Sequence, residues 1–194
     1  MMIKERPDEN EDIHTLVERI KKADREAFMT ITNLYQKKVF LLAFSFFHNK
    51  EDALDIVQET FLRLYQRVNL FRKGQNFQNW LLQIAKNLCI DYYRKNYSRS
   101  KDYDREKPIE EMNLALQNER DPYFSSDLKG IFSACLKKLA TKQRVIFVMK
   151  HYNQLEYQEI AQILGISLGT VKSLHFKAVQ NMRGLVAPYL GREL

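Results

Sequence analysis

The stretch LEYQEIAQILGISLGTVKSLHFKA, residues 155–178, carries the strongest structural pattern in this chain. Apolar residues recur three and four positions apart on both sides of a glycine, which is the spacing of two short amphipathic helices. Gly165 stands where the first helix must end in a left-handed conformation, and Ser167 can cap the second. The residues predicted to face the core or fill the turn are Ile160, Ala161, Leu164, Ile166, Val171 and Ala178. The stretch therefore predicts a helix-turn-helix.

The outward side of the second helix in this pair is polar and basic near its start. A helix-turn-helix lays its second helix in the DNA major groove, where hydroxyl and lysine side chains hold phosphates or reach base edges. The positive end of the helix dipole adds to that attraction. A solvated helical hairpin without a ligand is the alternative, and the turn sequence and local basic charge favour duplex DNA. The predicted contacts are Ser167, Thr170, Lys172, Ser173 and Lys177.

Composition favours an all-α protein with a polyanionic partner. Only 6 Gly and 4 Pro occur in 194 residues, which argues against a loop-rich β fold. The formal net charge of +7 makes a polyanion the default partner, although an ordinary basic surface is compatible with it. The charge is uneven: residues 97–126 carry 5 basic and 7 acidic side chains, whereas residues 127–194 carry 10 and 4.

The helical pattern is interrupted once. After a polar tail at residues 1–11, residues 12–96 hold four helical segments, and a helical pattern resumes in residues 127–194. Residues 97–126 are charged, contain two prolines and show no sustained period, so we expect a flexible acidic linker. A surface loop packed on one domain is the alternative. The predicted fold class is all-α, with two small helical domains joined by a flexible linker and the C-terminal one a helix-turn-helix.

Short polar residues predict where several helices begin. Asp24 and Asn49 are the predicted N-caps of the second and third helices, and Asp52 is placed to complete a capping box with Asn49. Thr141 is the predicted N-cap of the helix that precedes the helix-turn-helix.

The third predicted helix carries an acidic, amide-rich stripe opposite its apolar face. Such a stripe with one exposed leucine suits the groove of a protein partner. A plain solvated face is the alternative on physical grounds alone. The residues in question are Asp55, Gln58, Glu59 and Leu62.

The fourth predicted helix, from Phe77 to about Lys95, presents an aromatic, two amides, an acid and an arginine on one outer stripe, beside a basic turn. Aromatic rings stack on unpaired bases, amides contact base edges and cations hold the backbone, so the pattern favours single-stranded DNA. A half-buried core position is the alternative for the tryptophan. The candidate residues are Arg72, Lys73, Gly74, Gln75 and Asn76 in the turn, and Trp80, Gln83, Asn87, Asp91 and Arg94 on the helix.

Three motifs in this order resemble those of the extracytoplasmic-function group of bacterial RNA polymerase sigma factors: DALDIVQETFLRLY from Asp52, FQNWLLQIAKNLCIDYYRK from Phe77 and EIAQILGISLGTVKS from Glu159. The resemblance covers nearly the whole chain except its first dozen residues. It implies a promoter-specificity subunit that binds core RNA polymerase, recognises an upstream and a downstream promoter element and promotes DNA opening.

The resemblance also assigns roles to the candidate surfaces. The acidic stripe would bind the clamp of the largest polymerase subunit, and the C-terminal domain would meet the flap of the second-largest subunit. The basic turn would pocket a flipped base of the melted downstream element, with Asn87 and Asp91 reading it, Arg94 on the backbone and Trp80 near the fork. The helix-turn-helix would read the upstream element as duplex, the acidic linker would thread the polymerase, and an anti-sigma factor is an expected partner.

The sequence departs from the family pattern at the recognition helix. Leu174 and His175 stand where an arginine and a leucine are usual. Either Leu174 joins the core with His175 at its polar rim, which we favour, or Leu174 contacts a thymine methyl group. Glu156 replaces the usual hydroxyl cap of the first helix of the pair, which predicts a weaker cap by roughly 1 kcal/mol.

Other function classes find less support. A free-standing helix-turn-helix regulator of duplex DNA is the main alternative, although it needs neither the acidic stripe nor the single-strand stripe. The chain shows no P-loop, HExxH or GxSxG motif, and its histidines are scattered, so we expect no catalytic residues and no cofactor. Cys89 and Cys135 lack metal-ligand spacing and are predicted to be buried reduced thiols. The polar start and the absence of a long apolar run predict a cytoplasmic protein with no membrane insertion.

Overall fold

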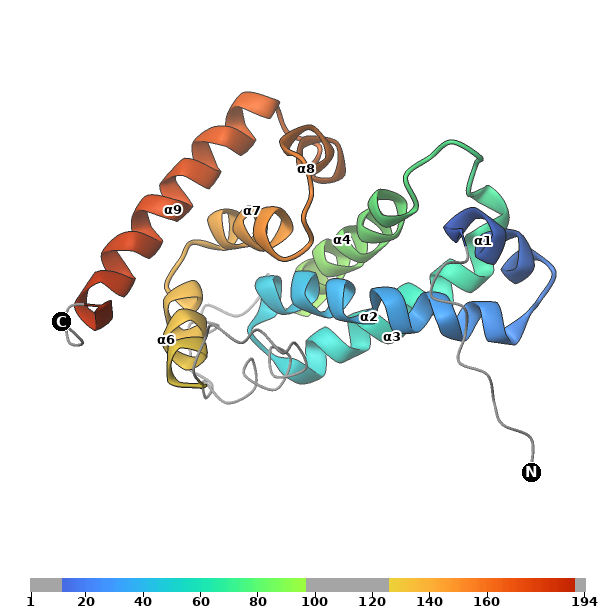
Figure 1. Cartoon of the computed structure of the whole chain (residues 1–194), viewed down its shortest axis with the longest axis horizontal. Coiled ribbons are helices and arrows are strands. Elements are labelled where there is room, and N and C mark those ends of the chain that lie inside the picture. Colours follow the sequence, from blue (N-terminus) through green and yellow to red (C-terminus); the bar gives the residue numbers. More distant parts are fainter. Residues whose placement is uncertain (1–11, 97–125, 191–194) are drawn as a thin grey trace.

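The computed structural model describes residues 12–96 and 126–190, and within these ranges it contains helices and short connections but no strand (Figure 1). The N-terminal half consists of α1 (Ile13–Lys21), α2 (Arg25–Phe47), α3 (Lys50–Arg67), the 3-10 turn η1 (Val68–Leu70) and α4 (Phe77–Asn96). The C-terminal half consists of α6 (Ser126–Lys137), α7 (Thr141–His151), α8 (Tyr157–Leu164) and α9 (Leu168–Leu190). The predicted polar tail and, except for Ser126, the predicted linker at 97–126 lie outside the described residues.

The N-terminal half is built on the long helices α2 and α3, which pack side by side and are covered by α4 and α1. Both predicted caps are confirmed. The Asp24 side chain accepts hydrogen bonds from the backbone N–H groups of Glu26 and Ala27, and the Asn49 side chain accepts from those of Glu51 and Asp52. The carboxylate of Asp52 also accepts a hydrogen bond of 2.8 Å from the Tyr92 hydroxyl, which ties α3 to α4.

In the C-terminal half, α7, α8 and the first part of α9 pack around one another, and α6 lies beside the second part of α9 (Figure 1). The prediction that Thr141 is an N-cap is wrong by one residue. Ala140 occupies the N-cap position without a side-chain bond, and Thr141 is the first helical residue. The Thr141 hydroxyl instead lies 3.4 Å from Nη2 of Arg144. The same guanidinium also donates hydrogen bonds to the backbone carbonyls of Lys137 and Leu139 before this helix.

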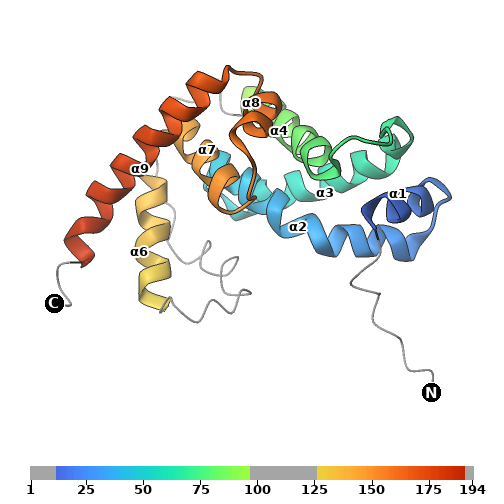
Figure 2. The ribbon, with the colours of Figure 1, turned by 45° about the horizontal axis from the view of Figure 1, so that its top comes forward.

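The two halves pack directly against each other. Helix α7 lies along the C-terminal part of α2, and α8 lies against the start of α4 (Figures 1 and 2). One apolar cluster includes Phe44 and Phe47 of α2 together with Leu136 of α6 and Phe147 of α7. The packing therefore positions the helix-turn-helix beside the basic turn that precedes α4.

Candidate nucleic-acid interface

The turn between α8 and α9 has the predicted geometry. Gly165 adopts a left-handed conformation with φ of 68°, and its N–H donates to the carbonyl of Ala161 at 2.9 Å. The Ser167 hydroxyl accepts a hydrogen bond of 3.1 Å from the backbone N–H of Thr170 and lies 2.8 Å from the hydroxyl of Thr170. The two hydroxyls thus contribute hydrogen bonds to the start of α9, and the exposed Lys172 and Lys177 contribute positive charge further along it.

All five residues predicted to bind duplex DNA are exposed, Ser167 just before α9 and the other four along its first part, while Val171 and Ala178 on the opposite side are fully buried. Phe176, which is not among the predicted contacts, has a side chain that is 63% exposed on the same outer side. It follows Lys172 and Ser173 by four and three positions, so it continues their stripe. This helical spacing predicts that Phe176 is exposed. Its ring offers an apolar surface beside Lys172 and Lys177.

The interpretation of Leu174 as core agrees with the structure. Leu174 is partly buried and packs against the apolar core. The ring of His175 lies at the polar rim, with Nδ1 3.0 Å from the Tyr157 hydroxyl and Nε2 3.0 Å from Nε2 of His151. Burial, His151 and Lys150 together lower the pKa of His175. These contacts join α7, α8 and α9 behind the predicted DNA surface.

The start of α8 is completed by Glu159 as well as by its N-cap residue, Glu156. One carboxylate oxygen of Glu159 accepts a hydrogen bond of 2.7 Å from the backbone N–H of Glu156. The Glu156 carboxylate lies 3.3 Å from the ammonium group of Lys150. Glu156 thus stands in place of a hydroxyl N-cap, and Glu159, the third residue of α8, bonds back to its backbone as in a capping box.

The basic turn stands out from the body of the N-terminal half. Residues 72–76 are all exposed, and Gly74 has φ of 91°, a conformation that favours glycine. The Gln75 side chain accepts a hydrogen bond of 3.1 Å from the backbone N–H of Arg72, which closes the turn. Asn76 also has an unpredicted structural role, because its side-chain oxygen accepts a hydrogen bond of 3.0 Å from the N–H of Asn79 at the start of α4.

The predicted stripe on α4 is exposed at four of its five positions. Gln83, Asn87, Asp91 and Arg94 are exposed along one side of the helix. Trp80 is partly buried, with its ring centroid 5.3 Å from that of Phe71 and 5.9 Å from that of Phe77. This position agrees with the interpretation of Trp80 as half-buried core. Two members of this aromatic cluster, Phe71 and Phe77, are buried and flank the exposed basic turn at its two ends.

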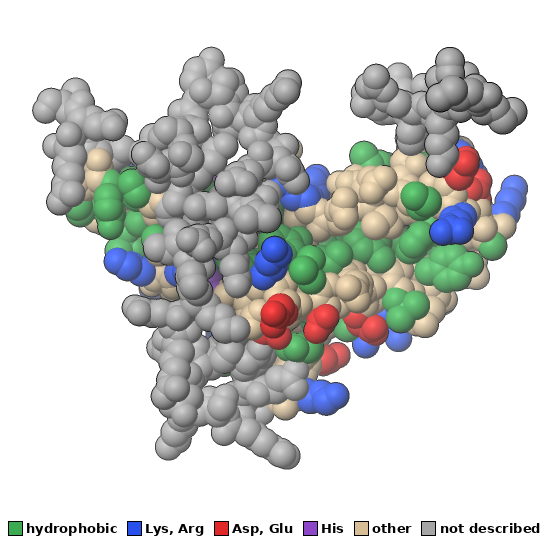
Figure 3. All heavy atoms as spheres, turned by 90° about the horizontal axis from the view of Figure 1, so that it is seen from below, with side chains coloured by type: hydrophobic (Ala, Val, Ile, Leu, Met, Phe, Trp, Pro, Cys, Tyr) green, Lys and Arg blue, Asp and Glu red, His purple; other side chains and the backbone are tan. Residues whose placement is uncertain are grey.

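The outer side of α3 combines carboxylates with exposed apolar side chains. Asp55 and Gln58 are exposed, and Glu59 forms an ion pair of 2.9 Å with Arg63 one turn later. Leu62 is 51% exposed, and Leu54 and Tyr65 are also exposed on this helix. In Figure 3, which looks onto the underside of Figure 1, acidic side chains gather beside hydrophobic ones in the middle of the face. A surface of this kind suits a protein partner better than a nucleic acid.

The structure brings two of these surfaces together. The side-chain amides of Asn76 and Asn79 donate to one oxygen of Glu159, at 3.4 and 2.7 Å. The end of the basic turn and the helix-turn-helix therefore share a contact. The acidic side of α3 takes no part in that contact.

Other kinds of site find no support in the described ranges. Residues 12–96 and 126–190 hold no group of three or more His, Cys, Asp or Glu side chains that could bind a metal ion. Cys89 and Cys135 are buried and form no disulfide, and burial raises the pKa of both thiols. Among the helices of these ranges, none is long and apolar enough to cross a membrane.

Comparison with known proteins identifies both halves. Residues 31–99 match the family Sigma-70 region 2, and residues 129–182 match the family Sigma-70, region 4. The chain is 31% identical over 182 residues to ECF RNA polymerase sigma factor SigW of Bacillus subtilis, covering 89% of this chain and 90% of that protein. It is also 31% identical over 186 residues to the ECF RNA polymerase sigma-E factor of Escherichia coli K12, covering 91% and 95%.

Solved structures share the fold. The sigma factor RpoE of Bartonella quintana, in complex with the anti-sigma factor NepR, superposes with a TM-score of 0.67 at 24% identity, covering 82% of this chain and 96% of that one. CnrH, in complex with the cytosolic domain of CnrY, superposes with a TM-score of 0.65 at 21% identity, covering 91% and 99%.

Proposed function

The chain belongs to the extracytoplasmic-function RNA polymerase sigma factors, and from this premise we propose how its surfaces divide the work of starting transcription. The chain is a promoter-specificity subunit. It binds core RNA polymerase, reads an upstream promoter element as duplex DNA and a downstream element as a melted strand, and so promotes DNA opening. The observation that supports this assignment most is the presence of three different surfaces on one chain.

The outer side of α3 binds the clamp of the largest polymerase subunit. Asp55 and Gln58 offer exposed polar contacts, and Leu62 offers an exposed apolar contact at the end of the stripe. Protein interfaces commonly combine apolar contacts with polar ones in this way. Glu59 belongs to the same surface, where its carboxylate is oriented by Arg63. The flap of the second-largest subunit is the corresponding partner of the C-terminal half.

The basic turn and the exposed side of α4 hold the melted strand. Arg72 and Lys73 supply the positive charge and Gly74 the backbone turn, so that a flipped base can lie against the loop. Gln83, Asn87, Asp91 and Arg94 continue along α4 with groups that bind base edges and backbone. Trp80 supports this surface from below, because its ring is part of the aromatic cluster with Phe71 and Phe77.

The start of α9 reads duplex DNA in the major groove. Lys172 and Lys177 bind phosphates, and Ser173 reaches toward base edges. Ser167 and Thr170 hold the start of α9 through their hydrogen bonds, close to the DNA backbone. Phe176 adds an apolar contact for a thymine methyl group or a sugar.

The remaining assignments follow from this role. The polymerase performs the chemistry, so the chain itself is not an enzyme and needs no cofactor. It acts in the cytoplasm, where polymerase and promoter DNA meet. An anti-sigma factor is a further partner, as it is for the Bartonella quintana protein with which this chain shares its fold. A free-standing regulator of duplex DNA is the alternative, and it is not favoured because it would use the α9 surface alone.

Transcription in vitro tests the proposal directly. Purified chain is added to core RNA polymerase with a library of random promoter sequences, and the transcripts are sequenced. Transcripts enriched for two separated sequence elements are expected. A chain that stimulates no transcript from any template, while still binding duplex DNA, would support the free-standing regulator instead.

A further inference from the structure

A buried arginine joins the two halves of the molecule. Arg144 of α7 is only 5% exposed, and its Nε donates a hydrogen bond of 2.6 Å to the backbone carbonyl of Ser45 in α2. Its Nη1 donates to the carbonyl of Leu139 at 2.7 Å. The guanidinium is thus held by neutral oxygen atoms and brings an uncompensated positive charge into the interface.

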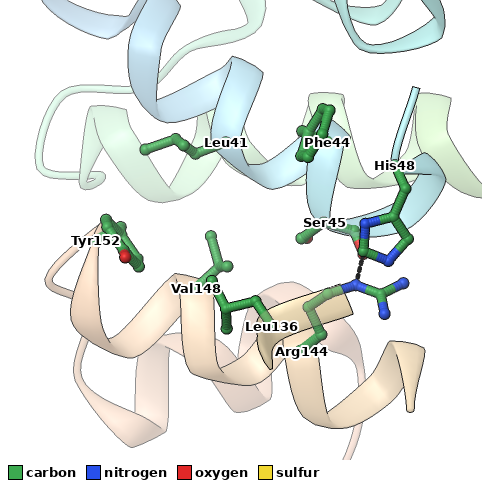
Figure 4. Close-up of a pocket in the computed structure, with 8 residues that line it drawn as sticks. All are labelled: Leu41, Phe44, Ser45, His48, Leu136, Arg144, Val148 and Tyr152. Carbon is green, nitrogen blue, oxygen red and sulfur yellow. Dashed lines mark hydrogen bonds between the residues drawn. The ribbon is translucent and has the colours of Figure 1, made fainter. Parts of the chain in front are cut away.

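A histidine without a hydrogen-bond partner faces this arginine. His48 ends α2 in a left-handed conformation with φ of 53°, and both of its ring nitrogens are buried without a hydrogen bond. Figure 4 shows its ring directed toward the Arg144 guanidinium in a small, mostly apolar pocket between α2, α6 and α7. The ring of Phe44 meets it edge-on at 5.9 Å.

This surrounding favours the neutral imidazole. Burial and the positive charges of Arg144 and Lys137 lower the pKa of His48 from its ordinary value of 6.5 to about 3. The charged groups that act on the ring are Arg144 of α7 and Lys137 of α6, and among the described residues no carboxylate lines the pocket. Both cations belong to the C-terminal half. When the halves separate, the ring regains water and loses the two cations, so its pKa returns toward 6.5.

We propose that the interface between the two halves is a proton-responsive clasp, which stays closed while His48 is neutral and opens when His48 takes up a proton. The sign follows from linkage, because only the open form binds the proton readily. The ratio of closed to open form is therefore near its maximum at about pH 7.5, is halved at about pH 6.5, and falls about tenfold between pH 7.5 and 5.5.

Opening has a direct consequence for the candidate surfaces. In the closed form Glu159 holds the side chains of Asn76 and Asn79, so the end of the basic turn is engaged with the helix-turn-helix. Melted and duplex DNA lie at separate places along a promoter, so a chain that binds both needs its halves apart. Protonation of His48 would thus separate the two halves, which stay packed together at neutral pH, and free the end of the basic turn from Glu159.

Single-molecule energy transfer in the full-length chain tests the clasp without polymerase or DNA. Dyes are placed on cysteines introduced at the exposed positions Gln36 in α2 and Gln162 in α8, since both native cysteines are buried. An Asn79→Ala background weakens the closed form so that both populations can be counted. We expect the closed-to-open ratio to fall about tenfold from pH 7.5 to 5.5.

The matched variant is His48→Asn, because asparagine tolerates the left-handed conformation and does not titrate in this range. It should abolish the pH response, whereas His14→Gln and His151→Gln should keep it. An unchanged ratio in the parent chain, or an equal fall in His48→Asn, would overturn the proposal. Loss of the helical circular dichroism signal over the same pH range would also overturn it, because it would show unfolding rather than opening.

Discussion

The side-chain amide of Asn79 donates a hydrogen bond of 2.7 Å to Glu159, a residue 80 positions later in the chain. The other carboxylate oxygen of Glu159 accepts the backbone N–H of Glu156 and so completes the start of α8. One carboxylate therefore serves both the local fold of the helix-turn-helix and its contact with α4.

Changing Asn79 should separate these two roles. Asn79→Ala should lower the free energy of unfolding by about 1 kcal/mol, because it removes one partly buried hydrogen bond to a charged group. Asn79→Asp should lower it more, because two carboxylates would then face each other. Urea unfolding followed by circular dichroism measures both, with the exposed Gln83→Ala as control. Equal stability of all three variants would remove this contact from the interface.

Replacing Lys172 and Lys177 by Ala should weaken binding to duplex DNA across all sequences. Both side chains are exposed on α9, and the loss of two phosphate contacts should reduce the slope of log affinity against log salt by about 2. Fluorescence anisotropy over a salt series measures the slope. Lys142→Ala, on the exposed side of α7, is the control. Unchanged affinity at every salt concentration would show that α9 does not face the DNA.

Gly74→Ala should impair promoter melting more than duplex binding. A Cβ atom at this glycine would meet no atom within 4 Å, so the effect comes from backbone strain of about 1 kcal/mol at a φ of 91°. Permanganate reactivity of unpaired thymines should fall in the presence of core polymerase. Asn87→Ala, which leaves the backbone unchanged, should have the same effect through lost base contacts. Normal melting with impaired duplex binding would mean that the roles of the two halves are reversed.

A double change of Asp55 and Gln58 to Ala should weaken the complex with core polymerase about tenfold, which corresponds to roughly 1.4 kcal/mol. Co-elution from a sizing column at a series of concentrations measures the loss. A second double variant, Glu26→Ala with Gln36→Ala on the exposed side of α2, matches it in charge and size. If both variants co-elute like the parent chain, the outer side of α3 is not part of the polymerase interface.

The features that could be predicted from the sequence are those fixed by near neighbours in the chain. Asp24 and Asn49 cap their helices because each needs only a backbone N–H two or three residues away. Gly165 and Ser167 set the turn of the helix-turn-helix for the same reason. The exposure of the predicted DNA-binding residues follows from the helical period alone, and Phe176 shares that period because it lies four positions after Lys172.

The features that could not be predicted depend on partners far away in the chain. Arg144 and Ser45 lie 99 positions apart, and neither has a local pattern that distinguishes it from an ordinary helix residue. Asn76 combines an amide suited to nucleic acid with a capping role that depends on where α4 begins. The N-cap of α7 is Ala140, one position before the predicted Thr141, whose hydroxyl instead accepts a contact of 3.4 Å from the Arg144 guanidinium on another turn of the helix.

The same long separation sets an order of events on the ribosome. Ser45 emerges 99 residues before Arg144, which at typical translation speeds is a delay of roughly 5 to 20 s. Throughout that delay the side of α2 that carries Phe44 and Phe47 lacks the later helices that cover it. The uncovered apolar side of a nascent N-terminal half is therefore a surface that chaperones can bind until the rest of the polypeptide arrives.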